Sequence, residues 1–167
     1  TALLYLYKPY INNPDYENFK YEDKTIYTYF QSLPDHRYSQ FASICFEKLY
    51  NFCDRIGDLL AYHFYDKFSD TERIYFWYVV NQLNKDPIIS SNKFFIQILS
   101  YRDTSFKEIN TVRKDIVHNY QIEADYRFNF TINSTNEVEI KKLWEFKSTL
   151  PEYFKKHLKY ANDLFYN

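Results

Sequence analysis

Glycine is almost absent from this chain, and its scarcity limits the folds that the chain can form. Gly57 is the only glycine among 167 residues. Tight hairpin turns and phosphate-binding loops need residues that tolerate a positive φ, which glycine adopts at low cost. The composition therefore disfavours an all-β fold, a Rossmann-like fold and any glycine-rich phosphate loop.

Net charge is also close to zero, because 21 lysine and arginine residues stand against 22 aspartate and glutamate residues, for a formal charge of −1. A chain so balanced has no global field that would draw it to nucleic acid or to an acidic membrane. The balance counts against a non-specific nucleic-acid-binding protein, but it is compatible with a small, local RNA site.

Cysteine is scarce, and long apolar runs are absent. Cys45 and Cys53 lie in one predicted helix with their Cα atoms about 12 Å apart, which is too far for a disulfide. No run of about 18 apolar residues occurs, so we predict no membrane span. Reduced cysteines and the lack of a span favour a cytoplasmic protein without a membrane partner.

Common enzyme signatures are missing as well. The sequence holds no CxxC pair, HExxH helix, P-loop or serine nucleophile elbow. Its four histidines are scattered, without the spacing of metal ligands. We therefore predict neither a metal site nor a cofactor.

Hydrophobic spacing predicts a single all-α domain over residues 1–167, an up-and-down helical bundle of about five or six helices. Residues 1–15 contain Pro9 and Pro14 and no clear period, so we predict an extended N-terminal arm. The predicted helices cover residues 16–33, 41–68, 69–83, 92–101, 105–120 and 139–167.

The boundaries of these helices follow from capping and proline signals. Ser69 and Ser105 are each followed three residues later by a glutamate, the capping-box spacing that opens a helix. Pro34 is predicted to stop the first helix. Pro151 either kinks the last helix or lies in the first turn of a second one.

The hydrophobic period changes between the last two helices. Tyr126, Phe128, Phe130 and Ile132 alternate with polar residues, which is a strand pattern. The polar residues 133–136 form a predicted turn. We therefore expect a small β hairpin or extended segment near residues 126–140.

One segment, TVRKDIVHNY at residues 111–120, combines residue types suited to RNA chemistry. Arg113 and His118 lie near the end of a predicted helix. An arginine fork binds phosphate oxygens through two charge-assisted hydrogen bonds, and histidine exchanges protons near neutral pH. RNA supplies its own 2′-hydroxyl nucleophile, so cleavage by this pair needs no metal ion.

The same two residues also have structural alternatives. Arg113 could form a surface ion pair with Glu108 or Asp115, and His118 could interact with the dipole at the helix end. The spacing alone leaves these alternatives open.

The segment resembles the motif of the HEPN family, which has an Arg, a polar residue, a short variable stretch and a His near a helix end. The all-helical pattern, the chain length and the late position of the motif extend this resemblance. It implies a dimeric bundle that is either a metal-independent ribonuclease, as in toxin–antitoxin and antiphage systems, or a nucleotide-binding or protein-interaction module. Lys114 departs from the motif, because the family more often has Asn, Asp or His there.

The resemblance also implies roles for individual residues. Arg113 would hold phosphate and His118 would act as general acid or base. Lys114, Asn119 and Tyr120 would shape the cleft around them.

Gly57 lies inside the predicted helix 41–68, where glycine costs about 1 kcal/mol relative to alanine. We therefore expect it to let another backbone, from this chain or a partner, approach closely. HEPN folds often carry an acidic residue on an earlier helix that orients the motif Arg. The resemblance gives this role to Asp58 or Asp54, and the alternative for each is a solvated carboxylate.

Three functional hypotheses follow from the sequence. The first is a HEPN-like homodimer that cuts RNA or binds RNA or a nucleotide, with an antitoxin or another protein as a further partner. The second is a catalytically inactive interaction or dimerisation module, and the third is a helical domain unrelated to HEPN.

Overall fold

A computed structural model describes residues 1–30, 32–69, 74–118 and 122–166, and the side chains within these ranges except those of 114–118, 122, 123, 125, 165 and 166. The described part is mainly helical with one two-stranded antiparallel sheet, which confirms the predicted all-α class. The chain forms two compact units. The first unit comprises Thr1–Cys45 and Lys114–Lys156, and the second comprises Phe46–Arg113 and His157–Asn167.

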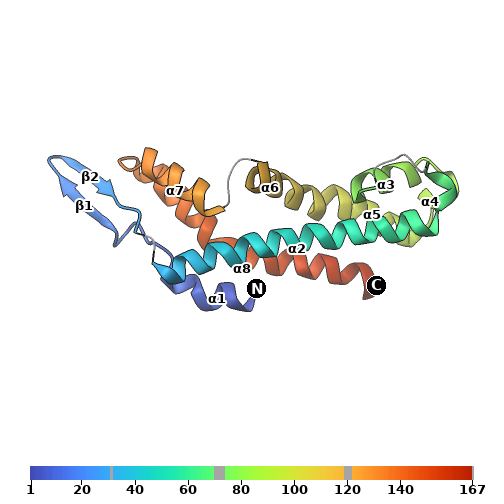
Figure 1. Cartoon of the computed structure of the whole chain (residues 1–167), viewed down its shortest axis with the longest axis horizontal. Helices are drawn as coiled ribbons and strands as arrows, with labels where there is room; N and C mark the ends of the chain where they lie inside the picture. Colours follow the sequence, from blue (N-terminus) through green and yellow to red (C-terminus); the bar gives the residue numbers. More distant parts are fainter. Residues whose placement is uncertain (31, 70–73, 119–121, 167) are drawn as a thin grey trace. The chain divides into compact units, whose positions relative to one another are not determined.

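The first unit contains a short N-terminal helix, a hairpin and parts of the longer helices (Figure 1). Its core includes Tyr27, Tyr126, Phe130 and Ile140. The elements are α1 (Ala2–Tyr7), the 3-10 helix η1 (Lys8–Tyr10), β1 (Asn18–Tyr21), β2 (Lys24–Tyr27), the start of α2 (Leu33–His63), α7 (Ile122–Ile132) and most of α8 (Glu137–Tyr166).

A buried ion pair lies in this first unit. Lys147 Nζ on α8 lies 2.7 Å from Asp35 Oδ1 on α2, and both side chains are excluded from solvent. The same ammonium lies 4.4 Å from the centre of the Tyr126 ring. Removing one partner of such a buried pair typically costs about 3–5 kcal/mol, because it leaves the other charge buried and unpaired.

The second unit gathers short helices around the C-terminal end of α2 (Figure 1). Phe76, Val79, Val80 and Leu83 of its α3 are buried in the core. The elements are the rest of α2, the 3-10 helix η2 (Tyr65–Lys67), α3 (Phe76–Leu83), α4 (Pro87–Ser90), α5 (Lys93–Tyr101), the π-helical turn η3 (Arg102–Phe106), α6 (Lys107–His118) up to Arg113, and the end of α8.

The β hairpin lies in a segment for which the sequence predicted a helix, residues 16–33. Asn18–Tyr21 and Lys24–Tyr27 pair in antiparallel fashion, with Tyr21 opposite Lys24. Aromatic and β-branched residues in this segment suit a pleated strand. Glu22 adopts a φ of 52° at the turn, a conformation that glycine adopts at lower cost.

The strand predicted at residues 126–132 is wrong, because these residues belong to α7. Tyr126 and Phe130 are buried, whereas Phe128 and Ile132 are exposed. Burial at a spacing of four is that of a helix face. Aromatic residues are so frequent here that an alternating run arises without a strand, and α8 already begins at Glu137.

Several predicted boundaries also change. Pro34 lies in the first turn of α2, where proline is tolerated, so it does not end a helix. The arm predicted as extended contains α1, and α8 continues through Pro151. Helix α3 begins at Phe76 and not at Ser69.

Cys45 and Cys53 are both free cysteines, the first half-buried and the second buried. Burial raises the pKa of the Cys53 thiol to about 12, so this side chain is a core residue and not a reactive thiolate. None of the described helices combines the length and apolarity that a bilayer crossing requires.

Candidate functional site

Arg113 is the one residue of the Arg–His motif whose side chain the structure describes. It lies on α6, and its guanidinium carbon is 3.7 Å from the centre of the Tyr50 ring on α2. This is close face-on contact between a cation and an aromatic ring, which favours a fixed guanidinium orientation. Tyr50 in turn packs on Phe106, with ring centres 5.8 Å apart.

Asp54 lies one helical turn after Tyr50 on α2, so both side chains are on the same face of that helix. Burial raises the pKa of Asp54 above its ordinary value. The backbone N–H of Phe76 and the positive charge of Arg113 act in the opposite direction. Of the two acidic candidates, Asp54 is therefore the one whose pKa the positive charge of Arg113 acts to lower.

Asp58, the other acidic candidate, forms a different contact. Its Oδ2 accepts a hydrogen bond of 3.0 Å from Arg55 Nη1 on the exposed side of α2. Its charge raises the pKa of Asp54. The structure therefore links Asp58 to Asp54 and Arg55.

Gly57 allows the start of α3 to approach α2 beside this site. A Cβ added to Gly57 would lie 2.8 Å from Phe76 Cα and 2.9 Å from Phe76 N. The close backbone approach predicted from the sequence is therefore present, within the chain itself. It also brings the Phe76 N–H to 3.5 Å from Asp54 Oδ1, at the N-terminal end of α3.

Glu108, one of the alternative partners considered for Arg113, contacts a histidine. Its Oε2 lies 3.2 Å from Nε2 of His157, which is fully buried on α8. The Ser105 hydroxyl hydrogen-bonds Nδ1 of the same ring. The second capping box is therefore wrong, because Ser105 lies in the π-helical turn and binds His157 instead of opening α6.

The remaining motif residues are located only in part. Lys114 and His118 belong to α6, but their side chains lie outside the described residues. Asn119 and Tyr120 lie wholly outside them, and the side chain of Asp115 does as well.

Tyr50 is the residue of this site that the sequence analysis missed. Its position four residues before Asp54 on a predicted amphipathic helix was the available signal. The signal is weak, because the chain has 19 tyrosines and a tyrosine at any one position therefore carries little information.

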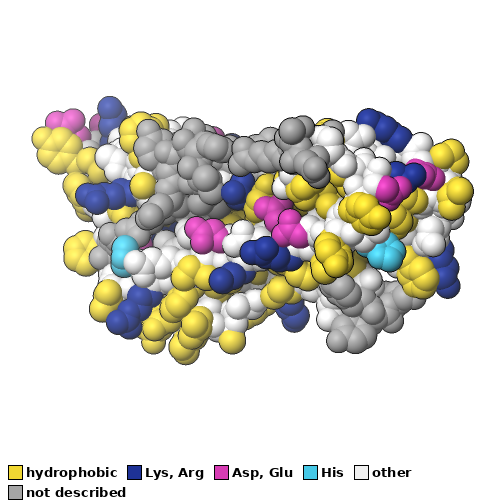
Figure 2. All heavy atoms as spheres, turned by 45° about the vertical axis from the view of Figure 1, so that its right-hand side comes forward, with side chains coloured by type: hydrophobic (Ala, Val, Ile, Leu, Met, Phe, Trp, Pro, Cys, Tyr) yellow, Lys and Arg dark blue, Asp and Glu magenta, His cyan; other side chains and the backbone are white. Residues whose placement is uncertain are grey.

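The arrangement can bind an anion at the edge of a stacked guanidinium. A guanidinium whose carbon lies over an aromatic ring can still direct the N–H groups at its edge toward phosphate oxygens. On the face shown in Figure 2, acidic and basic side chains are interspersed over the described residues. Within the described residues, no group of three His, Cys, Asp or Glu side chains could hold a metal ion.

Comparison with known proteins gave one family. A family model described as HEPN_Cthe2314-like HEPN matches residues 2–166. No curated protein and no solved structure gave a match. The matched range includes every residue of the Arg–His motif and all of both compact units except Thr1 and Asn167.

Proposed function

The chain belongs to the HEPN_Cthe2314-like HEPN family, and we propose that it is a homodimeric, metal-independent endoribonuclease in which Arg113 and His118 carry the chemistry. The observation that supports this proposal is the Arg113 guanidinium held against Tyr50, close to the charge of Asp54. Arginine fixed in this way is suited to grip a phosphate group.

In the proposed reaction the RNA 2′-oxygen attacks the neighbouring phosphorus, and the bond from phosphorus to the 5′-oxygen breaks. His118 accepts the 2′-hydroxyl proton, and a histidine of the second copy or water gives a proton to the leaving 5′-oxygen. Arg113 binds the phosphate oxygens, on which negative charge grows. The products are a 2′,3′-cyclic phosphate and a 5′-hydroxyl.

The dimer is part of the proposal because of the motif spacing. Residues five positions apart point roughly 140° apart around a helix, so one helix aligns Arg113 and His118 poorly. Two copies related by a two-fold axis can place both pairs in one cleft. Lys114, Asn119 and Tyr120 would shape this cleft, and Asp54, or Asp58 through Asp54, would orient Arg113.

RNA binding tests the role of Arg113 directly. We expect Arg113→Ala to weaken the binding of a short fluorescent RNA by about tenfold or more, as expected for the loss of charge-assisted hydrogen bonds. Arg113→Lys should recover part of the affinity, because lysine keeps the charge but not the fork. Arg37→Ala is the matched control, since Arg37 is an exposed arginine on α2. Equal losses in Arg37→Ala and Arg113→Ala would contradict the proposal.

The second candidate is an inactive module that binds RNA, a nucleotide or a protein such as an antitoxin. Lys114 favours it, because this position departs from the residues that the family more often has. Under this alternative Arg113 still supports binding, but RNA is not cut. The reduced cysteines suit a cytoplasmic location for either candidate.

A further inference from the structure

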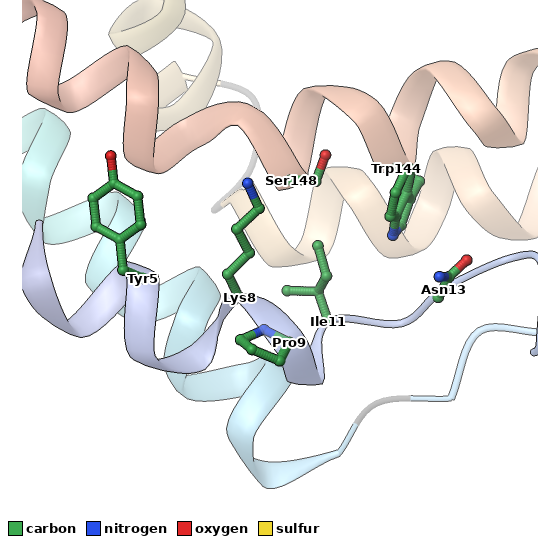
Figure 3. A pocket seen from close by; sticks show the side chains of 7 residues that line it. All are labelled: Tyr5, Lys8, Pro9, Ile11, Asn13, Trp144 and Ser148. Atoms are coloured by element: carbon green, nitrogen blue, oxygen red, sulfur yellow. The ribbon is translucent and has the colours of Figure 1, made fainter.

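The first unit contains a pocket that plays no part in the proposed RNA chemistry. Its volume is about 420 Å³, within the usual range for small-molecule sites. α1 and the chain that follows it form one wall, and α8 forms the other (Figure 3). The lining residues are Tyr5, Lys8, Pro9, Ile11, Asn13, Trp144 and Ser148.

Lys8 gives this pocket its charge. Among the described residues that line the pocket, Lys8 is the only charged one. Its ammonium lies 3.9 Å from Glu152 Oε1, which is longer than a hydrogen bond. The ammonium therefore keeps donors available for an anion.

Glu152 forms its hydrogen bond with Tyr5. It accepts a hydrogen bond from the Tyr5 hydroxyl at the rim of the pocket, and this contact raises the pKa of Tyr5. The carboxylate thus weakens the positive field of Lys8 without closing the pocket.

Trp144 supplies an apolar wall and an unsatisfied donor. Its indole Nε1 is buried and has no hydrogen-bond acceptor among the described residues. Burying a donor without an acceptor is unfavourable, so an acceptor oxygen beside this ring would lower the free energy. Ile11, itself buried, extends the apolar surface.

We propose that this pocket binds a small organic anion, with its anionic head on Lys8 and its apolar body against Trp144 and Ile11. A single cation beside an apolar wall favours a molecule with one anionic head, either a carboxylate or a phosphate, over a multiply charged one.

The indole N–H resonance of Trp144 in a ¹H–¹⁵N spectrum reports on the site. The chain has only two tryptophans, and Trp77→Phe assigns the signal of Trp144. We expect benzoate or phenyl phosphate to shift this signal in a saturable way at up to about 10 mM, because so small a ligand binds with a Kd of about 1 mM. The relative affinity of the two probes identifies the preferred head. The signal of Trp77, which lies in the second unit, should not move.

Charge variants separate a specific site from weak apolar binding. Lys8→Gln should reduce the affinity about tenfold, and Glu152→Gln should increase it, since the competing carboxylate is removed. Lys20→Gln, an exposed lysine on β1, is the matched control and should bind as the unaltered protein does. No shift with either anion would overturn the proposal. It would be overturned equally by a shift of the same size with benzyl alcohol or in Lys8→Gln.

Discussion

At the scale of single residues, the candidate site depends on Gly57, because glycine has no side chain. Gly57 lets the start of α3 approach α2, and this approach places the Phe76 N–H beside Asp54. Tyr50 lies against the Arg113 guanidinium. Burial raises the pKa of Asp54, one turn further along α2, and the charge of Arg113 opposes this rise. The surroundings of Asp54 therefore depend on how closely α3 packs on α2.

Gly57→Ala should destabilise the protein, although inside a helix alanine is generally about 1 kcal/mol more stable than glycine. The new Cβ would lie 2.8 Å from a backbone atom that cannot rotate away, so α3 must shift. We expect a net loss of about 1–3 kcal/mol in the free energy of unfolding, measured by urea denaturation. Asn51→Ala, at an exposed position of the same helix, is the control and should change stability little. Unchanged or increased stability in Gly57→Ala would show that α3 does not pack here as described.

Asp54 should give the protein a pH-dependent contribution to stability. Because burial raises its pKa in the folded state above the ordinary 3.8, the folded protein holds this proton more tightly than the unfolded chain. The contribution is therefore fully present below pH 3.8 and is lost as the pH rises through the raised value.

Asp54→Asn removes this titration. We expect the stability of the unaltered protein relative to Asp54→Asn to be greater near about pH 4 than near about pH 7, measured by urea denaturation at both values. Glu47→Gln, at an exposed position of α2, is the matched control for net charge. A difference that stays constant or grows with pH would contradict the description of Asp54.

At the scale of elements, one helix with a clear capping residue was predicted well, and the hairpin was missed because the local pattern carried no turn signal. The sequence predicted the helix of residues 92–101 well, because Asn92 is a true cap whose side chain accepts hydrogen bonds from Phe94 and Phe95. It misplaced the hairpin, because a turn containing Glu22 and Asp23 lacks the glycine that marks such turns.

The turn residue Glu22 provides a test of the hairpin. A left-handed conformation costs an L-residue roughly 1–2 kcal/mol, and glycine avoids most of this cost. After the greater freedom of glycine in the unfolded chain is allowed for, Glu22→Gly should stabilise the protein by about 0.5–1 kcal/mol in thermal or urea unfolding.

Asp23→Gly is the matched control for this substitution. Asp23 is outside the positive-φ region, so glycine brings only its entropic cost there and should be neutral or destabilising. If Glu22→Gly destabilised the protein as Asp23→Gly does, the turn would have a different conformation.

At the scale of the whole molecule, sequence and structure contribute different parts of the account. The helical class, the family motif and the close approach at Gly57 could be predicted from spacing and composition, because they depend on local or compositional signals. The stacking of Arg113 on Tyr50 could not, because it joins residues 63 positions apart in the chain. The Lys147–Asp35 pair was missed for the same reason, since it joins the start of α2 to α8.

The balanced charge of the chain also affects function. A net charge of −1 provides no long-range attraction for RNA, so under the proposed function recognition would come from a few local cations such as Arg113. The proposed ribonuclease therefore depends on the motif residues far more than on a general basic surface.

RNA cleavage in the presence of EDTA tests this central claim most directly. Purified protein, Arg113→Ala, His118→Ala and the control Arg37→Ala, at an exposed arginine of α2, are compared on one end-labelled RNA. We predict that the unaltered protein and Arg37→Ala cut the RNA despite chelation and leave 2′,3′-cyclic phosphate ends. Arg113→Ala and His118→Ala should each lose about a hundredfold or more in rate, the typical size of a general acid–base contribution. Cleavage that EDTA abolishes, or that both motif variants retain, would contradict the account.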